Sequence, residues 1–117
     1  KIPFIEEQTS MKKALKIMSN KNLGTLVAIN KKKQTTGIIT DGQVRRFSEK
    51  NIDLNILKVR DVMTKNPIKI EKDTLATKAL SIMNQKKITS LCVHNKGNKL
   101  NTIGIIHIHN ILNSKIY

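Results

Sequence analysis

The sequence predicts an α/β (α+β) fold in which two pseudosymmetric β-α-β-β-α units pack as a pair around an interdomain cleft. Two observations lead to this prediction. A shift of 65 residues lays the first half of the chain over the second, and both halves show the same order of hydrophobic patterns. The identical pairs include Thr9/Thr74, Ala14/Ala79 and Met18/Met83. A repeat of this length is too long for a solenoid and too short to be stable alone, so we expect the copies to share a core.

Each copy is expected to open with a short extended segment, 3–5 or 68–70, and then a helix. Thr9 and Thr74 precede these helices and are expected to cap them by accepting a hydrogen bond from a free backbone N–H. Apolar residues recur at helical spacing, which predicts one buried face. They are Met11, Ala14, Leu15 and Met18 in the first copy and Ala76, Ala79, Leu80 and Met83 in the second.

A hairpin is expected after each of these helices. The apolar runs TLVAI (25–29) and SLCVH (90–94) have strand length, and polar turns join them to TGIIT and IGIIH. Two such runs around a polar turn are typical of a β-hairpin. A second helix is expected to begin near Asp41 or Ile108. The resulting division is a first unit at 1–50, incomplete at its N-terminus, a linker at 51–59 and a second unit at 60–117.

Composition narrows the classes of function. The formal net charge is +14, but lysines supply most of it, they are scattered along the chain, and two Phe and one Tyr are the only aromatic residues. Proteins that bind nucleic acids by base stacking need more aromatic side chains than this. A basic nucleic-acid-binding domain is therefore only the third hypothesis for the function, after the two given below. No apolar stretch approaches the ~20 residues of a membrane span, and a cytoplasmic protein is expected. Cys92 is the single cysteine, which excludes an internal disulfide and favours a core role.

Two stretches carry a family resemblance. RDVMTKNPIKIEKDTLATKALSIM (60–83) and GIITDGQVRR (37–46) resemble a tandem cystathionine-β-synthase-type (CBS) domain pair, or Bateman module, over essentially the whole chain. GIITDGQVRR together with GIIHIHNIL (104–112) is similar to the C-terminal CBS pair of arabinose-5-phosphate isomerases. Those enzymes interconvert arabinose 5-phosphate and ribulose 5-phosphate on the route to the lipopolysaccharide sugar Kdo.

The resemblance implies a regulatory role rather than catalysis by this chain. The catalytic sugar-isomerase domain of that family precedes the CBS pair and is not matched here, so the chain is expected to be a fragment of a larger isomerase. That N-terminal domain would be a partner within the same polypeptide. Self-association of CBS pairs implies a homodimer or higher homo-oligomer. No cofactor, metal or membrane partner is implied.

The resemblance also implies a ligand site. CBS pairs bind nucleotides through a motif of Gly, two apolar residues, Ser or Thr, two further residues and Asp. The run 37–40 fits, with Gln43 at the acid position, while 104–106 fits with His107 and Asn110 at the hydroxyl and acid positions. Amides in place of both acids favour an anionic nucleotide sugar over adenosine nucleotides, with CMP-Kdo as the leading candidate. The candidate ligand-binding residues are Thr40, Asp41, Gln43, Arg45, Arg46, Thr64, Thr89, Ser90, His107, His109 and Asn110.

Plainer interpretations stay open for several of these residues. Thr40 and Asp41 also suit a simple helix cap, and Arg45 and Arg46 also suit a solvated face. His107 and His109 form an H-x-H pair, but two ligands make a weak metal site. No arrangement typical of a catalytic site is visible. The alternative to a ligand sensor is a dimerisation or interaction module whose pocket has degenerated.

Overall fold

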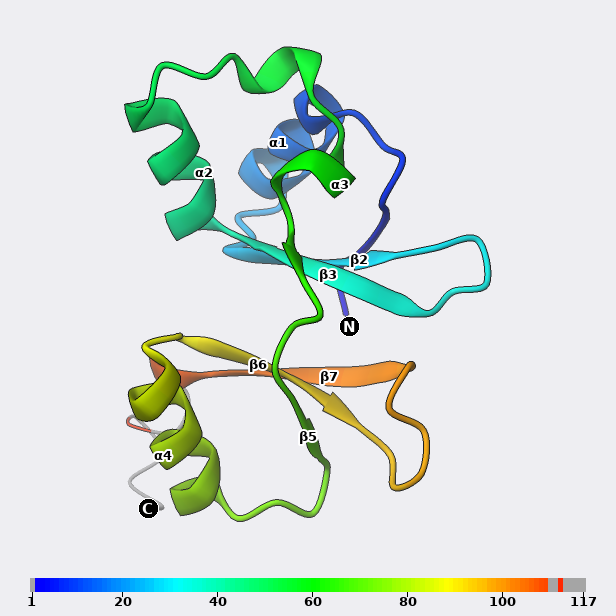
Figure 1. Ribbon diagram of the computed structural model, residues 1–117, viewed down its shortest axis with the longest axis vertical. Helices are drawn as coiled ribbons and strands as arrows, with labels where there is room; N and C mark the ends of the chain where they lie inside the picture. Colours follow the sequence, from blue (N-terminus) through cyan, green and yellow to red (C-terminus); the bar gives the residue numbers. More distant parts are fainter. Residues whose placement is uncertain (1, 110–111, 113–117) are drawn as a thin grey trace. The chain divides into compact units, whose positions relative to one another are not determined.

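The computed structural model describes residues 2–109 and 112, and it divides into two compact units, Lys1–Asn66 and Pro67–Tyr117 (Figure 1). Each unit contains one small sheet with its own hydrophobic cluster. Both units show the strand, helix, strand, strand order that the repeat predicts, which confirms the expected mixture of helices and sheets. Each unit is described below by itself.

Unit 1 is a four-stranded sheet in the order β1-β2-β3-β4, with its helices on one side (Figure 1). Strand β1 runs parallel to β2, while the β2/β3 and β3/β4 pairs are antiparallel. The elements are β1 (Phe4–Glu6), α1 (Met11–Asn20), β2 (Thr25–Ile29), β3 (Thr35–Thr40), α2 (Asp41–Glu49), the 3-10 turn η1 (Leu54–Ile56), α3 (Val59–Val62) and β4 (Thr64–Lys65).

Helix α1 has the predicted buried face but a different cap. Ser10, and not Thr9, is the N-cap residue, and its side chain accepts a hydrogen bond from the backbone N–H of Lys13. The prediction for Thr9 was wrong because its backbone is used elsewhere: its N–H donates to the carbonyl of Glu6 and its carbonyl accepts from Val59. Met11, Ala14 and Met18 are buried, as the helical spacing predicted.

The segment 51–66 is part of unit 1 in space. Backbone hydrogen bonds run from Met11 N to Leu57 O (2.8 Å), from Val59 N to Thr9 O (2.8 Å) and from Arg60 N to Glu7 O (2.9 Å). Strand β4 then adds to the sheet beside β3. The boundary between the compact units therefore falls after Asn66, whereas the division at 50 and 60 was drawn from the sequence repeat and stays a prediction.

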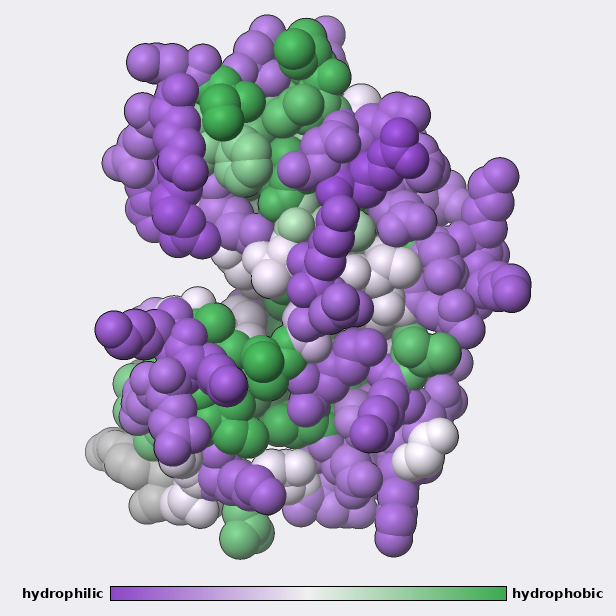
Figure 2. All heavy atoms as spheres, viewed as in Figure 1, coloured by the Kyte–Doolittle hydropathy of each residue, from purple (hydrophilic) through white to green (hydrophobic). Residues whose placement is uncertain are grey.

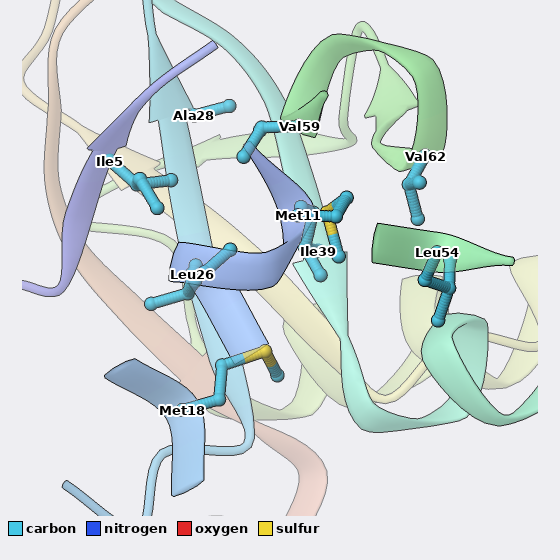
Figure 3. Packing of buried hydrophobic residues seen from close by; sticks show 10 residues of the cluster. Ile5, Met11, Met18, Leu26, Ala28, Ile39, Leu54, Val59 and Val62 are labelled. Carbon is cyan, nitrogen blue, oxygen red and sulfur yellow. The ribbon is translucent and has the colours of Figure 1, made fainter. Parts of the chain in front are cut away.

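One cluster of buried side chains holds unit 1 together (Figure 3). It draws on β1, α1, β2, β3, η1 and α3, so the segment after α2 contributes to the same core as the sheet. The buried members are Ile5, Met11, Ala14, Met18, Leu26, Ala28, Ile39, Leu54, Val59 and Val62. Full burial of one such side chain contributes about 1.5–3 kcal/mol, and this sum opposes the chain entropy lost on folding.

Unit 2 repeats the pattern with a three-stranded sheet in the order β5-β6-β7. Its elements are β5 (Lys69–Glu71), α4 (Ala76–Lys86), β6 (Ser90–His94) and β7 (Thr102–His107). The N-cap of α4 is Leu75, which makes no side-chain capping bond, so the prediction that Thr74 caps this helix was also wrong. Ile70, Ala79, Met83, Leu91 and Val93 form the buried cluster.

The helix predicted to close unit 2 is described in part. Ile108, His109 and Leu112 are helical, and Ile108 packs against the cluster of unit 2. Asn110, a predicted ligand-binding residue, lies outside the described residues. Across 2–109 and 112, no helix has the length and apolar character that crossing a membrane requires.

Candidate anion site at the start of helix α2

The end of β3 leads directly into α2 through a capping box at Thr40. The Thr40 Oγ1 accepts from the backbone N–H of Gln43 (3.4 Å), and the Thr40 N–H donates to Gln43 Oε1 (3.2 Å). The two bonds satisfy one free N–H of the first turn and fix the direction of the helix. Gly37 to Thr40 therefore form the end of strand β3, and the nine-residue helix α2 begins at the next residue, Asp41.

Cationic side chains gather beside the first turn of α2, around Gly42. A methyl group built on Gly42 would lie 3.3 Å from Arg46 Nη1, 3.9 Å from Thr40 Oγ1 and 4.0 Å from Arg45 Nη2. The absence of a side chain at Gly42 thus leaves a space that a methyl group would fill tightly, bordered by one hydroxyl and by the guanidinium groups of the exposed Arg45 and Arg46. Free N–H groups and the helix dipole make this end of a helix favourable for anions.

Asp41 lies at the edge of a different hollow in unit 1. Its backbone N–H donates to the Gly24 carbonyl (3.1 Å), and its Oδ2 would be 3.2 Å from a methyl group on Gly24. The carboxylate lines a pocket of about 410 Å³. The other lining residues are Leu15, Met18, Ser19, Asn22, Leu23, Gly24 and Val44. The polar groups of this lining are Ser19, Asn22 and the Asp41 carboxylate, and the negative charge suits an uncharged or cationic group better than a phosphate.

Gln43 connects the site to the segment after α3. Its Nε2 donates to the Val62 carbonyl (3.2 Å) and to Thr64 Oγ1 (2.6 Å), while its Oε1 accepts from Thr40 N. Both amide hydrogens and one oxygen lone pair are therefore in use. A carboxylate could not donate to the Val62 carbonyl, which gives a physical reason for an amide at the position where the family motif has an acid. Gln43 and Thr64, both predicted ligand residues, are thus hydrogen-bonded to each other.

Gly37, the first residue of the same motif, is needed for close packing. A methyl group there would approach Met63 Cγ to 2.7 Å and the Thr64 carbonyl to 2.9 Å, both closer than real contacts. In the β3/β4 register, Gly37 faces Lys65. The sequence did not predict β4, because Thr64 and Lys65 form too short a strand to give an alternating pattern.

In unit 2 the predicted residues pair with each other across β6 and β7. Ser90 Oγ and His107 Nδ1 lie 2.9 Å apart, and Ser90 is opposite His107 in the strand register. The Thr89 carbonyl accepts from the N–H of Ile108 (2.8 Å), and His109 is exposed. The structure therefore brings Thr89, Ser90 and His107 together at one end of this sheet, where unit 1 has Thr25 and Thr40.

Two features were not found from the sequence. A second hollow in unit 1, of about 440 Å³, lies between the loop after β1 and the β2–β3 turn and is lined by Glu6, Glu7, Gln8, Ile29, Asn30, Lys31, Lys32 and Gln34. Its charges are mixed and mostly exposed, so no pattern marked it. The role of Gly42 was also missed, although a glycine between a capping threonine and two arginines was a readable signal.

Among the described residues, no group of three or more His, Cys, Asp or Glu side chains could hold a metal.

Cys92 is buried in β6. Desolvation raises the pKa of its thiol above the ordinary value of 9.0, while a hydrogen bond with Thr102 and the charge of Lys69 oppose the rise. A buried thiol of this kind is a poor nucleophile, because the thiolate is the reactive form.

Comparison with known proteins identifies the family. The family model for the CBS domain matches residues 1–50 and 59–116. The chain belongs to the CBS domain family. A CBS-domain signal-transduction protein from Burkholderia ambifaria superposes with a TM-score of 0.87 at 21% identity, over 99% of this chain and 83% of that one. A second CBS protein, from Pyrobaculum aerophilum and complexed with AMP, gives a TM-score of 0.81 at 16% identity, over 97% and 89%. These likenesses agree with the fold of a CBS pair.

A curated relative is more similar in sequence. The arabinose 5-phosphate isomerase KdsD of Yersinia pestis is 36% identical over 115 residues, which is 98% of this chain and 34% of that protein. The chain thus spans about a third of the length of this relative. It is homologous to the CBS region of such isomerases, and the match over this chain is to CBS domains.

Proposed function

We propose that this CBS pair is a regulatory ligand-sensing region of an arabinose-5-phosphate isomerase in Kdo and lipopolysaccharide synthesis. It would bind an anionic nucleotide or nucleotide sugar, with CMP-Kdo, the activated downstream product, as the leading candidate. The homology to KdsD over 98% of the chain supports the link to an isomerase. The observation that carries the ligand proposal is the convergence of Arg45, Arg46 and Thr40 around Gly42.

Each residue of this site has a proposed role. A phosphate or carboxylate of the ligand would lie beside Gly42, where the Arg45 and Arg46 guanidinium groups reach it with charge-assisted hydrogen bonds. The Thr40 hydroxyl, which accepts from Gln43 N, can still donate its own proton to an anion. Asp41 lines the neighbouring pocket and would meet a sugar hydroxyl or an amino group.

Unit 2 has candidate ligand residues of its own. Ser90 and His107 are hydrogen-bonded to each other, and the His107 ring keeps Nε2 for a second partner. We propose ligand contacts for these two and for Thr89, His109 and Asn110. The AMP complex of the Pyrobaculum CBS protein supports a nucleotide as the ligand class for this fold.

Regulation would follow from unequal affinity. A ligand changes the activity of an attached isomerase domain only by the difference between its affinities for the active and inactive states. The ligand would therefore act without touching the catalytic residues. The isomerase domain of the same polypeptide, and a second copy of the chain in a homodimer or higher homo-oligomer, are the proposed macromolecular partners.

Calorimetric titration with CMP-Kdo, AMP and ATP tests the proposal. Binding of one of them is expected, and the double variant Arg45→Gln/Arg46→Gln should weaken it about 10- to 100-fold, because two charge-assisted contacts are lost. The double variant Lys12→Gln/Lys13→Gln is the matched control, since it removes the same charge from an adjacent exposed pair on α1. Absence of heat with all three ligands, or equal weakening by both pairs, would contradict the proposal.

An interaction module with a degenerate pocket is the second candidate function. Two observations favour it: the Gln43 amide is already satisfied within the chain, and Ile56 is 79% exposed in the segment between α2 and α3. The face drawn in Figure 2 also shows hydrophobic patches among hydrophilic side chains in both units. This candidate predicts self-association in sedimentation and no ligand-dependent rise in melting temperature, whereas a bound ligand raises it.

A further inference from the structure

The hydrogen bonds of Gln43 join the proposed anion site to the part of unit 1 that leads into unit 2. We call the bonds from Gln43 Nε2 to Val62 O and Thr64 Oγ1 the Gln43 link. We propose that the Gln43 link is an intramolecular contact that a ligand must break. The proposal rests on the proposed ligand site at α2. Ligand binding would free β4, and the Gln43 link would hold it when the site is empty.

The first step concerns hydrogen-bonding capacity. An amide nitrogen has two hydrogens, and Gln43 Nε2 gives one to Val62 O at 3.2 Å and one to Thr64 Oγ1 at 2.6 Å. A phosphate or carboxylate has acceptors only, so it cannot use this nitrogen while both bonds are kept. Gln43 Oε1 is similarly occupied by the N–H of Thr40.

The second step concerns position. Gln43 is the third residue of α2 and caps the helix together with Thr40, whose hydroxyl borders the space at Gly42. The nitrogen that holds Thr64 thus belongs to the same helical turn that would receive the anion. A ligand that binds at Gly42 and also extends to the Gln43 amide would compete with Thr64 for its nitrogen.

The third step concerns what the Gln43 link holds. Strand β4 has two residues, both exposed, and pairs with β3 at Ile38/Thr64 and Gly37/Lys65. A strand this short depends on additional contacts, here the 2.6 Å bond from Gln43 and the packing of Met63 against Gly37. The chain enters unit 2 directly after Asn66, so β4 is the last element of unit 1 before the boundary.

Thr64→Val tests the Gln43 link without a change of charge. Valine keeps the branched shape and removes the hydroxyl, and Thr77→Val is the matched control on the exposed face of α4. We expect hydrogen exchange in a peptide covering 59–66 to be about 2- to 10-fold faster in Thr64→Val than in the wild type, and unchanged in Thr77→Val. Equal exchange in all three proteins would overturn the inference even if no ligand is added.

Calorimetry on the same proteins with CMP-Kdo, AMP and ATP separates this inference from the proposed function. Tighter binding by Thr64→Val, about 2- to 10-fold, with faster exchange at 59–66 when the wild type is saturated, supports the Gln43 link. Binding by Thr64→Val alone would also support it, as an autoinhibitory contact. Weaker binding by Thr64→Val would make Thr64 a ligand contact and overturn the inference, while leaving the proposed function intact. No binding by any of the three proteins would overturn both.

Discussion

Gly37 and Gly104 occupy the same position in the two repeats, yet the structure gives them different surroundings. A methyl group at Gly37 collides with Met63 and the Thr64 carbonyl, because β4 crosses beside it, whereas at Gly104 the nearest atom is Val93 Cβ at 3.8 Å, an ordinary contact. The motif therefore has a packing requirement in unit 1 that the described part of unit 2 does not share. The same motif glycine can therefore be required for packing in one copy and not in the other.

Gly37→Ala is expected to destabilise unit 1 by about 1–3 kcal/mol, the usual cost of forcing extra atoms into a packed site. Gly104→Ala serves as the matched control and should be neutral or slightly stabilising, since alanine loses less backbone entropy than glycine on folding. Urea denaturation of both variants measures the difference. Equal losses of stability would mean that β4 does not pack on Gly37 in solution.

Cys92 offers a second test at this scale. Because burial raises the pKa of its thiol, the folded protein holds the thiol proton more tightly than the unfolded chain. Its contribution to stability is complete below the ordinary pKa of 9.0 and is lost as the pH rises through the higher folded value. The free energy of unfolding should therefore fall more steeply above pH 9.0 in the wild type than in Cys92→Ala. Parallel pH profiles would contradict this assignment.

Helix α2 is the element on which the functional proposal depends. The capping box of Thr40 and Gln43 fixes its first turn, and Gly42 leaves the space that Arg45 and Arg46 border. The sequence located this helix and its start at Asp41, because the apolar strand, the capping threonine and the arginines are all local signals. Gln43 was expected to bind a ligand, and its bonds to Val62 and Thr64 depend on a long-range approach that no local pattern encodes.

Gly42→Ala separates stability from binding in this helix. Alanine is the better helix former, so the variant should be as stable as the wild type or more stable by about 0.5 kcal/mol. The added methyl group enters the space beside Arg46 Nη1, so affinity for the ligand found by calorimetry should fall about 10-fold. Thermal melting with and without ligand measures both effects. An unchanged affinity would place the anion elsewhere.

The N-cap residues of α1 and α4 could not be predicted from local sequence patterns. Ser10, not Thr9, caps α1, and Leu75, not Thr74, precedes α4. Two hydroxyl residues stand side by side at 9 and 10, and the sequence gives no preference between them. The choice comes from the backbone of Thr9, which is engaged by Glu6 and Val59, the latter fifty positions away.

At the scale of the whole molecule, the sequence repeat predicted the fold. The prediction was incomplete where one copy has a segment that the other lacks. The shift of 65 residues correctly gave two sheets with the same strand order. The hairpins were placed almost to the residue, because apolar runs and polar turns are strong signals. The segment 51–66 had no equivalent to compare with, so its packing onto unit 1 could not be derived.

Unit 2 is small enough to predict that it does not fold alone. Units much under about 60 residues bury too little surface to offset the chain entropy, and unit 2 runs from Pro67 to Tyr117. A peptide covering 67–117 should therefore give an NMR spectrum with poorly dispersed amide chemical shifts, while the full chain gives well-dispersed ones. A well-dispersed spectrum from the peptide would show that unit 2 is independently stable.

The claim that an anionic nucleotide binds beside the first turn of α2 is tested most directly by amide chemical shifts. A ¹⁵N-labelled full chain would be titrated with CMP-Kdo, and with AMP in parallel. We predict that the largest changes fall on the backbone amides of 41–44 and on the side-chain Nε signals of Arg45 and Arg46. Shifts confined to the hollow at Glu7, Asn30 and Lys32, or no shifts at saturating concentration, would contradict the account.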